Sequence, residues 1–322
     1  MMIEKPIKVL FSAPSYFLLQ FLDKYIEKYD VNFKEIWQVT DIPENAHHYD
    51  VWIPNPGQNF IIEDAILEKF SSLKLISTPS TGTNHISFMD CSKRSVKVFG
   101  LMDQRQGLNQ ISASAEFTFL KILASLRNLR ESWNEVDDGR WRHNEDNMRG
   151  YEVKEKNYGL VGMGRIGNKL VKYLDSFGAN NIIFHDTAVY QDDLAKAKLV
   201  TLEDIFKTSD VVVICVALNA ETKGMVDLHL LSKLKKNAHL INTSRGEIIN
   251  EADLITVLDS RKDIKFSADV LSGEVKSGCL NEQMLLLHKS NRINITPHIA
   301  GATYGSQSKA ATLAFDIIES NV

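Results

Sequence analysis

The chain has 322 residues, 44% of them hydrophobic and 24% charged, and a formal net charge of −4 at pH 7. This balance is typical of a soluble globular protein, and the length fits two domains or one large one. A weakly acidic chain gives no reason to expect nucleic acid or an anionic membrane surface as a partner. No run approaches the roughly 18 apolar residues of a membrane-spanning helix, so no membrane segment is expected.

The N-terminus is predicted to form a first strand and not a signal peptide, because Glu4 and Pro6 interrupt its short apolar run. The three cysteines, Cys91, Cys215 and Cys279, lie far apart and lack the spacing of metal ligands. We therefore expect free thiols, no metal site and a reducing, cytoplasmic setting.

Short apolar runs alternate with amphipathic segments along the chain, which is the pattern of parallel sheets with crossover helices. In the first hundred residues, helices are predicted at 16–29 and 63–72, among strands at 7–13, 49–55, 73–79 and 96–102. A second series of strands is predicted at 157–163, 181–186, 211–217, 238–244, 265–270 and 292–297. The fold class is therefore α/β, with two parallel-sheet units in one chain.

The segment between the two series predicts a long helix at 112–130, with apolar residues on one side, that connects the units. The following segment, 131–157, is polar and contains two tryptophans. It is interpreted as a surface segment and a candidate subunit contact.

A glycine-rich turn follows the first strand of the second series. Gly162, Gly164 and Gly167 form a GxGxxG pattern at the start of a helix, and the next strand ends in Asp186. Such a turn lets a backbone approach a pyrophosphate, and an acidic residue about 20 positions later accepts from the ribose hydroxyls. Residues 187–189 include no arginine or lysine for a 2′-phosphate, which favours NAD over NADP. A methyltransferase can share these features, as can an ordinary turn with a solvated aspartate.

Ionisable residues also stand at the ends of the last three strands. Arg245 follows the strand at 238–244, Asp269 and Glu274 follow the next, and His298 follows the last. Carboxyl ends of parallel strands share one edge of a sheet, so these groups are expected to gather at a ligand crevice. Taken singly, each has a simpler interpretation: a capping arginine, a solvated carboxylate or a packed histidine.

At this point the chain resembles the D-isomer-specific 2-hydroxyacid dehydrogenase family. The resemblance rests on a set of motifs in a fixed order: "LKLISTPSTGTNHI", "DDGRW", "GLVGMGRIG", "SDVV", "AETKGMV", "LINTSRGEIINEADL", "SADV" and "TPHIAGAT". It implies a flavodoxin-like substrate domain at 1–103 and 296–322, an inserted Rossmann NAD-binding domain at 104–295, and a homodimer. The implied substrate is a small 2-hydroxy or 2-oxo acid.

The resemblance also implies roles for individual residues. Arg245, Glu274 and His298 match the catalytic residues, with Arg245 also binding substrate. Substrate contacts are further implied for Ser80, Thr81 and Gly82. Cofactor contacts are implied for Gly162, Gly164, Arg165, Ile166, Gly167, Asp186, Val216, Ser244 and Asp269.

The residue types suit the reduction of a 2-oxo acid by NADH. His298 can donate a proton near neutral pH, and Glu274 can stabilise its protonated form. The guanidinium of Arg245 can bind the substrate carboxylate and polarise its carbonyl. The rest of the substrate is expected to meet loops near Ser15, Asn55, Thr81 and Met102.

Several departures from the family pattern leave the substrate open. Relatives that oxidise 3-phosphoglycerate carry arginines where this chain has Pro54 and Thr78, which argues against a phosphorylated acid without excluding it. Ala217 and Ala220 replace usual prolines, and the segment after Glu274 lacks a usual glutamate-proline pair. A non-catalytic NAD(H)-sensing protein is a further alternative, and Glu274 argues against a formate-type dehydrogenase.

Overall fold

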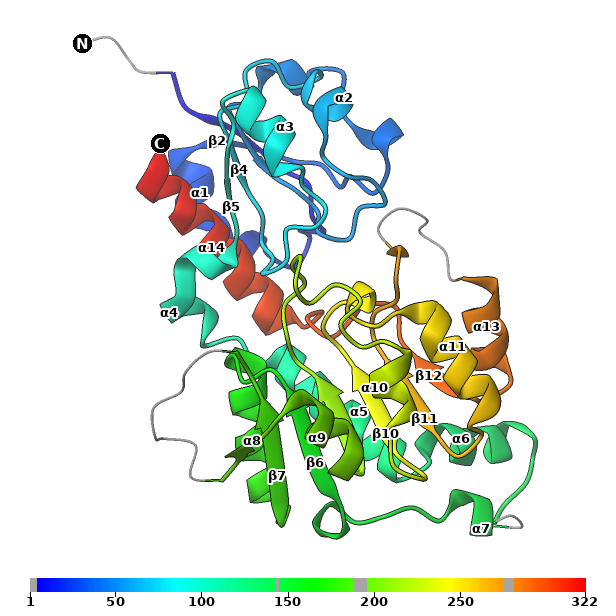
Figure 1. Cartoon of the computed structure of the whole chain (residues 1–322). Helices are drawn as coiled ribbons and strands as arrows, with labels where there is room; N and C mark the ends of the chain where they lie inside the picture. The colour runs from blue at the N-terminus through cyan, green and yellow to red at the C-terminus, as the bar shows by residue number, and fades with distance from the viewer. Residues whose placement is uncertain (1–4, 143–144, 188–195, 275–280) are drawn as a thin grey trace. The chain divides into compact units, whose positions relative to one another are not determined.

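The computed structural model describes residues 5–142, 145–187, 196–274 and 281–322 (Figure 1). The described chain divides into two compact units. The first contains residues 5–111 and 302–322 together with Glu274, and the second contains residues 112–273 and 281–301. Cys279 and the positions 188 and 189, which enter the predictions above, lie outside the described residues.

The first unit is built on a five-stranded parallel sheet with the order β2-β1-β3-β4-β5. This is the flavodoxin-like order, in which the chain reverses direction along the sheet between β1 and β3. The strands are β1 (Lys8–Phe11), β2 (Asp30–Phe33), β3 (Val51–Ile53), β4 (Leu75–Ser77) and β5 (Lys97–Phe99).

Helices cover both faces of this sheet, so its central strands are apolar without alternation. Val9 and Phe11 of β1 pack under α1 and α14, which lie side by side in Figure 1, whereas Leu10 packs under α2 and α3. The helices are α1 (Leu19–Lys28), α2 (Asp64–Leu67), α3 (Phe88–Lys93), α4 (Arg105–Leu108) and α14 (Tyr304–Asn321). Short 3₁₀ turns are η1 (Val39–Asp41), η2 (Ala46–His48) and η3 (Leu101–Gln104).

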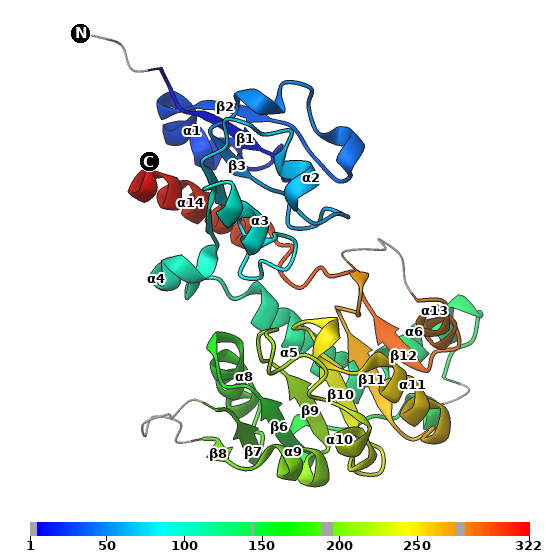
Figure 2. The same ribbon diagram turned by 45° about the horizontal axis from the view of Figure 1, so that its top comes forward.

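The second unit contains a seven-stranded parallel sheet with the order β12-β11-β10-β9-β6-β7-β8 (Figure 2). The chain reverses direction along the sheet between β6 and β9, which is the Rossmann arrangement. The strands are β6 (Asn157–Val161), β7 (Asn181–His185), β8 (Lys198–Leu199), β9 (Val211–Ile214), β10 (His239–Asn242), β11 (Lys265–Ala268) and β12 (Ile293–Ile295).

Helices also cover both faces of the second sheet. Apolar residues of α5 and α8 pack on one face, and those of α9, α10, α11 and α13 pack on the other. The helices are α5 (Ala113–Leu126), α6 (Leu129–Asp137), α7 (Glu145–Met148), α8 (Arg165–Ser176), α9 (Leu202–Thr208), α10 (Leu228–Ser232), α11 (Glu251–Ser260) and α13 (Glu282–Lys289). The 3₁₀ turns are η4 (Val153–Glu155) and η5 (Gly246–Ile248). The predicted class, two doubly wound parallel sheets, is confirmed.

The differences from the prediction have local causes. The edge strands β2 and β8 were not predicted, because their residues are half-buried or exposed and give no continuous apolar run. The helix predicted at 112–130 is interrupted at Asn128, which adopts a left-handed conformation with φ of 49° between α5 and α6. The helix predicted at 63–72 is only the short α2. Within the described residues, no helix has the length and apolar character to cross a membrane.

Candidate active site

The glycine-rich turn between β6 and α8 depends on close backbone contacts. Gly162 has φ of +99°, and a Cβ there would lie 2.7 Å from a methyl carbon of Val216, in the loop after β9. A Cβ on Gly167 would lie 2.5 Å from the carbonyl oxygen of Gly162. A side chain at either glycine would therefore force the turn away from β9 or from α8.

The third glycine, Gly164, has a different environment. It is the N-cap of α8, and a Cβ there would meet no atom within 4 Å. The first turn of α8 has no acidic residue, and its N-cap makes no side-chain hydrogen bond. The N–H groups of a first helical turn and the positive end of the helix dipole favour an anion at this point, and open space beside the backbone lets it approach. These features fit the pyrophosphate of a dinucleotide.

Asp186 stands directly after β7 and is held to the same turn. Its Oδ2 accepts a hydrogen bond of 2.7 Å from the backbone N–H of Met163, and the N–H of Gly162 donates to the carbonyl of His185 at 2.8 Å. The strand end and the glycine turn are thus joined by two hydrogen bonds. Arg165 opens α8 beside them, and burial lowers the pKa of its guanidinium.

The loop that carries Arg245 is shaped by a buried asparagine at the end of β10. Asn242 is 1% exposed; its Oδ1 accepts from the N–H and Oγ of Ser244, and its Nδ2 donates to the carbonyl of Arg245. Arg245 Nη1 donates to the carbonyl of Ser244 at 2.6 Å. Gly246 then passes so close to the loop after β11 that a Cβ would lie 2.0 Å from the carbonyl carbon of Leu271.

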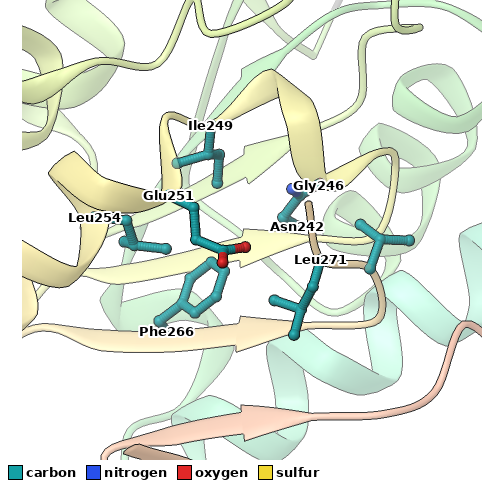
Figure 3. Close-up of a pocket in the computed structure, with 8 residues that line it drawn as sticks. Asn242, Gly246, Ile249, Glu251, Leu254, Phe266 and Leu271 are labelled. Carbon is teal, nitrogen blue, oxygen red and sulfur yellow. The ribbon is translucent and has the colours of Figure 1, made fainter. Parts of the chain in front are cut away.

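A small cavity lies behind this loop (Figure 3). Its volume is about 10 Å³, at or below the roughly 10–15 Å³ that one water needs, so it is too small for a substrate. The carboxylate of Glu251 points into it and accepts from the N–H of Ser272 at 3.1 Å. Burial raises the pKa of Glu251. The remaining lining residues are Asn242, Gly246, Ile249, Leu254, Phe266, Val270 and Leu271.

The turn that carries His298 is built around the carboxylate of Asp269, which is 1% exposed. Oδ1 of Asp269 accepts from Oγ1 of Thr296 at 2.5 Å and from the N–H of Ile299 at 3.1 Å, and Oδ2 accepts from the N–H of Ala300 at 2.7 Å. The N–H of His298 donates to the carbonyl of Asp269 at 2.8 Å. His298 is exposed and has φ of 53°, a left-handed conformation that costs energy in a non-glycine residue. These four hydrogen bonds hold it there.

Arg245, Asp269 and His298 thus all follow strands at the carboxyl edge of the second sheet, on the adjacent strands β10, β11 and β12. Val216 and Ser244 stand at the same edge, after β9 and β10. Glu274 is counted with the first unit and is the last described residue before position 281, so its contact with His298 stays a prediction.

The predicted substrate loop, Ser80 to Gly82, lies in the first unit directly after β4. Ser80 Oγ donates to the carbonyl of Gly82 at 2.7 Å and lies 2.9 Å from Oγ1 of Thr78, which in turn lies 3.1 Å from Nε2 of the buried His85. The carbonyl of Ser80 accepts from the N–H of Leu101 at 3.0 Å. The loop therefore has a defined conformation within its own unit.

Sequence reasoning missed three residues that shape the site: Asn242, Thr296 and Thr243. Thr243 Oγ1 lies 2.6 Å from Oγ1 of Thr118 on α5, which fixes the loop after β10 to that helix. Only Asn242 had a usable signal, because an asparagine two residues before a serine favours a local side-chain turn.

Comparisons with known proteins agree with this geometry. The family model "D-isomer specific 2-hydroxyacid dehydrogenase, NAD binding domain" matches residues 119–300, more than half of the chain. The chain belongs to the D-isomer-specific 2-hydroxyacid dehydrogenase family. The predicted resemblance is therefore confirmed, and NAD is the cofactor of the domain that the model describes.

Relatives in the family have several activities. A glyoxylate reductase of Thermofilum pendens is 32% identical over 258 residues, 79% of this chain and 73% of its own length. A formate dehydrogenase of Arabidopsis thaliana is 30% identical over 273 residues, 84% of this chain and 68% of its own length. The fold matches the D-lactate dehydrogenase of Aquifex aeolicus in complex with NAD and lactic acid, with a TM-score of 0.79, 22% identity, and coverage of 97% of this chain and 94% of that one.

Proposed function

We propose that this member of the 2-hydroxyacid dehydrogenase family interconverts a D-2-hydroxy acid and its 2-oxo acid with NAD as the redox partner. The observation that carries the proposal is the turn around Asp269, which holds His298 in a left-handed conformation at the edge where Arg245 also stands. A costly conformation held by several hydrogen bonds is typical of a functional position. The same edge of the sheet carries the glycine turn that fits a dinucleotide.

The chemistry follows from the residue types. When bound, NADH would supply the hydride that C2 of the 2-oxo acid needs, and the carbonyl oxygen must gain a proton. His298 donates that proton as general acid and takes it back as general base in the oxidative direction. Glu274 stabilises the protonated imidazole. Arg245 binds the substrate carboxylate with its planar guanidinium and stabilises the charge that develops on the carbonyl oxygen.

The environment of Asp186 supports NAD over NADP. Its carboxylate is fixed beside the glycine turn by Met163, where it can accept from a ribose hydroxyl and would repel a 2′-phosphate. Gly162, Gly164, Arg165, Ile166, Gly167, Val216, Ser244 and Asp269 are proposed to complete the cofactor site. The backbone N–H groups of Ser80, Thr81 and Gly82 are proposed to hold the substrate carboxylate together with Arg245.

A homodimer through the second unit is proposed as the working form. Its support is a set of exposed apolar side chains on α5, α6 and the segment after α6: Leu120, Trp133, Val136 and Trp141, which are 50–73% exposed. Exposed apolar residues in such numbers mark protein contacts. Light scattering during gel filtration should give a mass near twice the 36.4 kDa of the chain. The proposed location is the cytoplasm, which cell fractionation tests.

The function is tested by following NADH consumption by the purified protein with a panel of 2-oxo acids, including phosphorylated ones, and with NADPH as the cofactor control. We expect turnover with NADH and a much weaker response to NADPH. In the oxidative direction, D-2-hydroxy acids should react and their L-isomers should not. Formate and 3-phosphoglycerate are the comparison substrates for the two other reactions known in the family. Tight NADH binding without turnover on any acid would contradict the proposal.

A further inference from the structure

An aromatic cluster stands at the carboxyl edge of the sheet in the first unit. Tyr16 and Phe17 lie in the turn after β1, and Tyr304 is the first residue of α14. The ring centroids of Tyr16 and Phe17 are 5.1 Å apart, and those of Phe17 and Tyr304 are 5.2 Å apart, both edge to face. Such pairs fix the orientation of the rings relative to one another.

The cluster is anchored at its centre and exposed at both ends. Phe17 packs against the core that includes α1 and α14, whereas Tyr16 and Tyr304 are 75% and 69% exposed within the chain. Rings that are ordered by their neighbours and still exposed offer apolar surface to a further molecule at little entropic cost. The cluster is therefore a preformed apolar surface.

Its position in the sheet is where a ligand is expected. In the order β2-β1-β3-β4-β5 the chain reverses direction between β1 and β3. Doubly wound sheets bind ligands outside the carboxyl ends of the strands at this reversal. The turn that carries Tyr16 and Phe17 directly follows β1.

The loops that follow β1, β3, β4 and β5 at the same edge of the sheet contain no lysine or arginine. They are "SAPSYFL" (12–18), "PNPGQNFIIE" (54–63), "TPSTGTNHIS" (78–87) and "GLMDQ" (100–104), whose ionisable residues are Glu63, the buried His85 and Asp103. Several of their polar groups are already used: Asn55 donates to Ile36, and Thr78 pairs with Ser80. A phosphate or a second carboxylate on the substrate would find no lysine or arginine in these four loops.

We propose that Tyr16 and Tyr304 determine specificity and that the preferred substrates are 2-oxo acids whose side chain is a hydrocarbon chain or an aromatic ring. This inference rests on the proposed dehydrogenase function and adds the class of its substrate. The side chain packs on the exposed faces of the two rings, which removes apolar surface from water on both partners. One methylene in such a contact changes kcat/KM by roughly tenfold.

The test compares kcat/KM for NADH-dependent reduction of glyoxylate, pyruvate, 4-methyl-2-oxopentanoate and phenylpyruvate. The quantity that decides is the ratio of kcat/KM for the two bulky acids to that for glyoxylate. Tyr16→Ala and Tyr304→Ala remove the rings, Tyr16→Phe and Tyr304→Phe remove only the hydroxyls, and Phe88→Ala removes an exposed ring elsewhere in the same unit. Both tyrosines are exposed, so all these variants are expected to fold.

In the wild type, we expect kcat/KM for the bulky acids to be at least ten times that for glyoxylate. This ratio should fall tenfold or more in Tyr16→Ala and in Tyr304→Ala. It should stay unchanged in the two phenylalanine variants and in Phe88→Ala. Glyoxylate as the best substrate, or a ratio that the alanine variants leave unchanged, would overturn the specificity while the dehydrogenase function stands. Absence of NADH consumption with all four acids would overturn both.

Discussion

Replacing Asp269 with asparagine tests whether the turn around this carboxylate positions His298. The carboxylate accepts three hydrogen bonds, from Thr296, Ile299 and Ala300, at 2.5–3.1 Å. An amide oxygen can replace Oδ1, but the amide NH₂ would then face the N–H of Ala300, which is 5% exposed. The N–H of Ala300 would be a buried donor without an acceptor, which costs about 1–3 kcal/mol. The hydrogen bonds from Thr296 and Ile299 would also weaken, because their acceptor would no longer be charged. We expect a loss of about 3 kcal/mol in stability.

Asp269→Asn should also lower the rate of catalysis in the protein that remains folded. The hydrogen bonds of this turn hold the left-handed backbone of His298. A displacement of about 1 Å at a reacting group costs on the order of a hundredfold in rate. We therefore expect kcat to fall by roughly a hundredfold, with a smaller loss of NADH affinity, because Asp269 is also a proposed cofactor contact. Steady-state kinetics, NADH fluorescence titration and urea unfolding measure the three quantities separately.

The matched control is Asp210→Asn. Asp210 precedes β9 at the opposite edge of the same sheet, where its carboxylate accepts from the N–H and Nδ2 of Asn157 and pairs with Lys235. This variant should lose stability and keep kcat. An Asp269→Asn enzyme that loses stability but keeps kcat within threefold would refute the positioning role. A large loss of NADH affinity at unchanged kcat would instead make Asp269 mainly a cofactor contact.

Three further predictions concern the same unit. Gly246→Ala should lower kcat/KM tenfold or more, because its Cβ would lie 2.0 Å from the backbone of Leu271; Gly305→Ala, which meets no atom within 4 Å, is the silent control. Arg245→Lys should lower kcat/KM by roughly a hundredfold with NADH binding retained, since an ammonium cannot replace the guanidinium fork; activity near that of the wild type would exclude the assigned role. Burial and the charge of Lys265 lower the pKa of His239 to about 4. The unfolded chain takes up this proton from pH 6.5 downward and the folded chain does not, so stability should fall between pH 6.5 and 4 by roughly 3 kcal/mol. Urea unfolding at several pH values should show a flatter profile for His239→Gln, and equal profiles would refute this origin.

The sequence predicted the strands and turns whose signal is local. The residues of β6, β9 and β10 are buried on both faces, except for the first residue of β6, and they give hydrophobic runs in the sequence. The glycine turn directly follows β6. These strands and this turn could therefore be located from the sequence alone. β2 and β8 could not, because they are edge strands and their side chains are largely exposed. Asn128 was missed because no glycine or proline marks a break there. Its Nδ2 donates to the carbonyls of Asn147 and Arg149, which are contacts that only the fold supplies.

For the candidate site, the sequence identified which residues stand at the strand ends but not how they are held. Asp269 was predicted as a cofactor contact, and its bonds to Thr296, Ile299 and Ala300 join positions 27 to 31 residues apart. Residues this far apart in the sequence form no local sequence pattern from which their contact could be predicted. The same holds for Thr118 and Thr243, 125 residues apart. The aromatic cluster joins Phe17 to Tyr304 across almost the whole chain, so only the fold brings it together.

The measurement that tests the account most directly is the turnover of His298→Ala with NADH and the best 2-oxo acid of the panel, recorded beside NADH binding on the same preparation. The account predicts NADH affinity within a few-fold of the wild type and a loss of turnover of roughly a hundredfold or more, the usual scale for a general acid. Undiminished turnover would contradict it, because the proton would then come from another group and the turn around Asp269 would have no catalytic purpose.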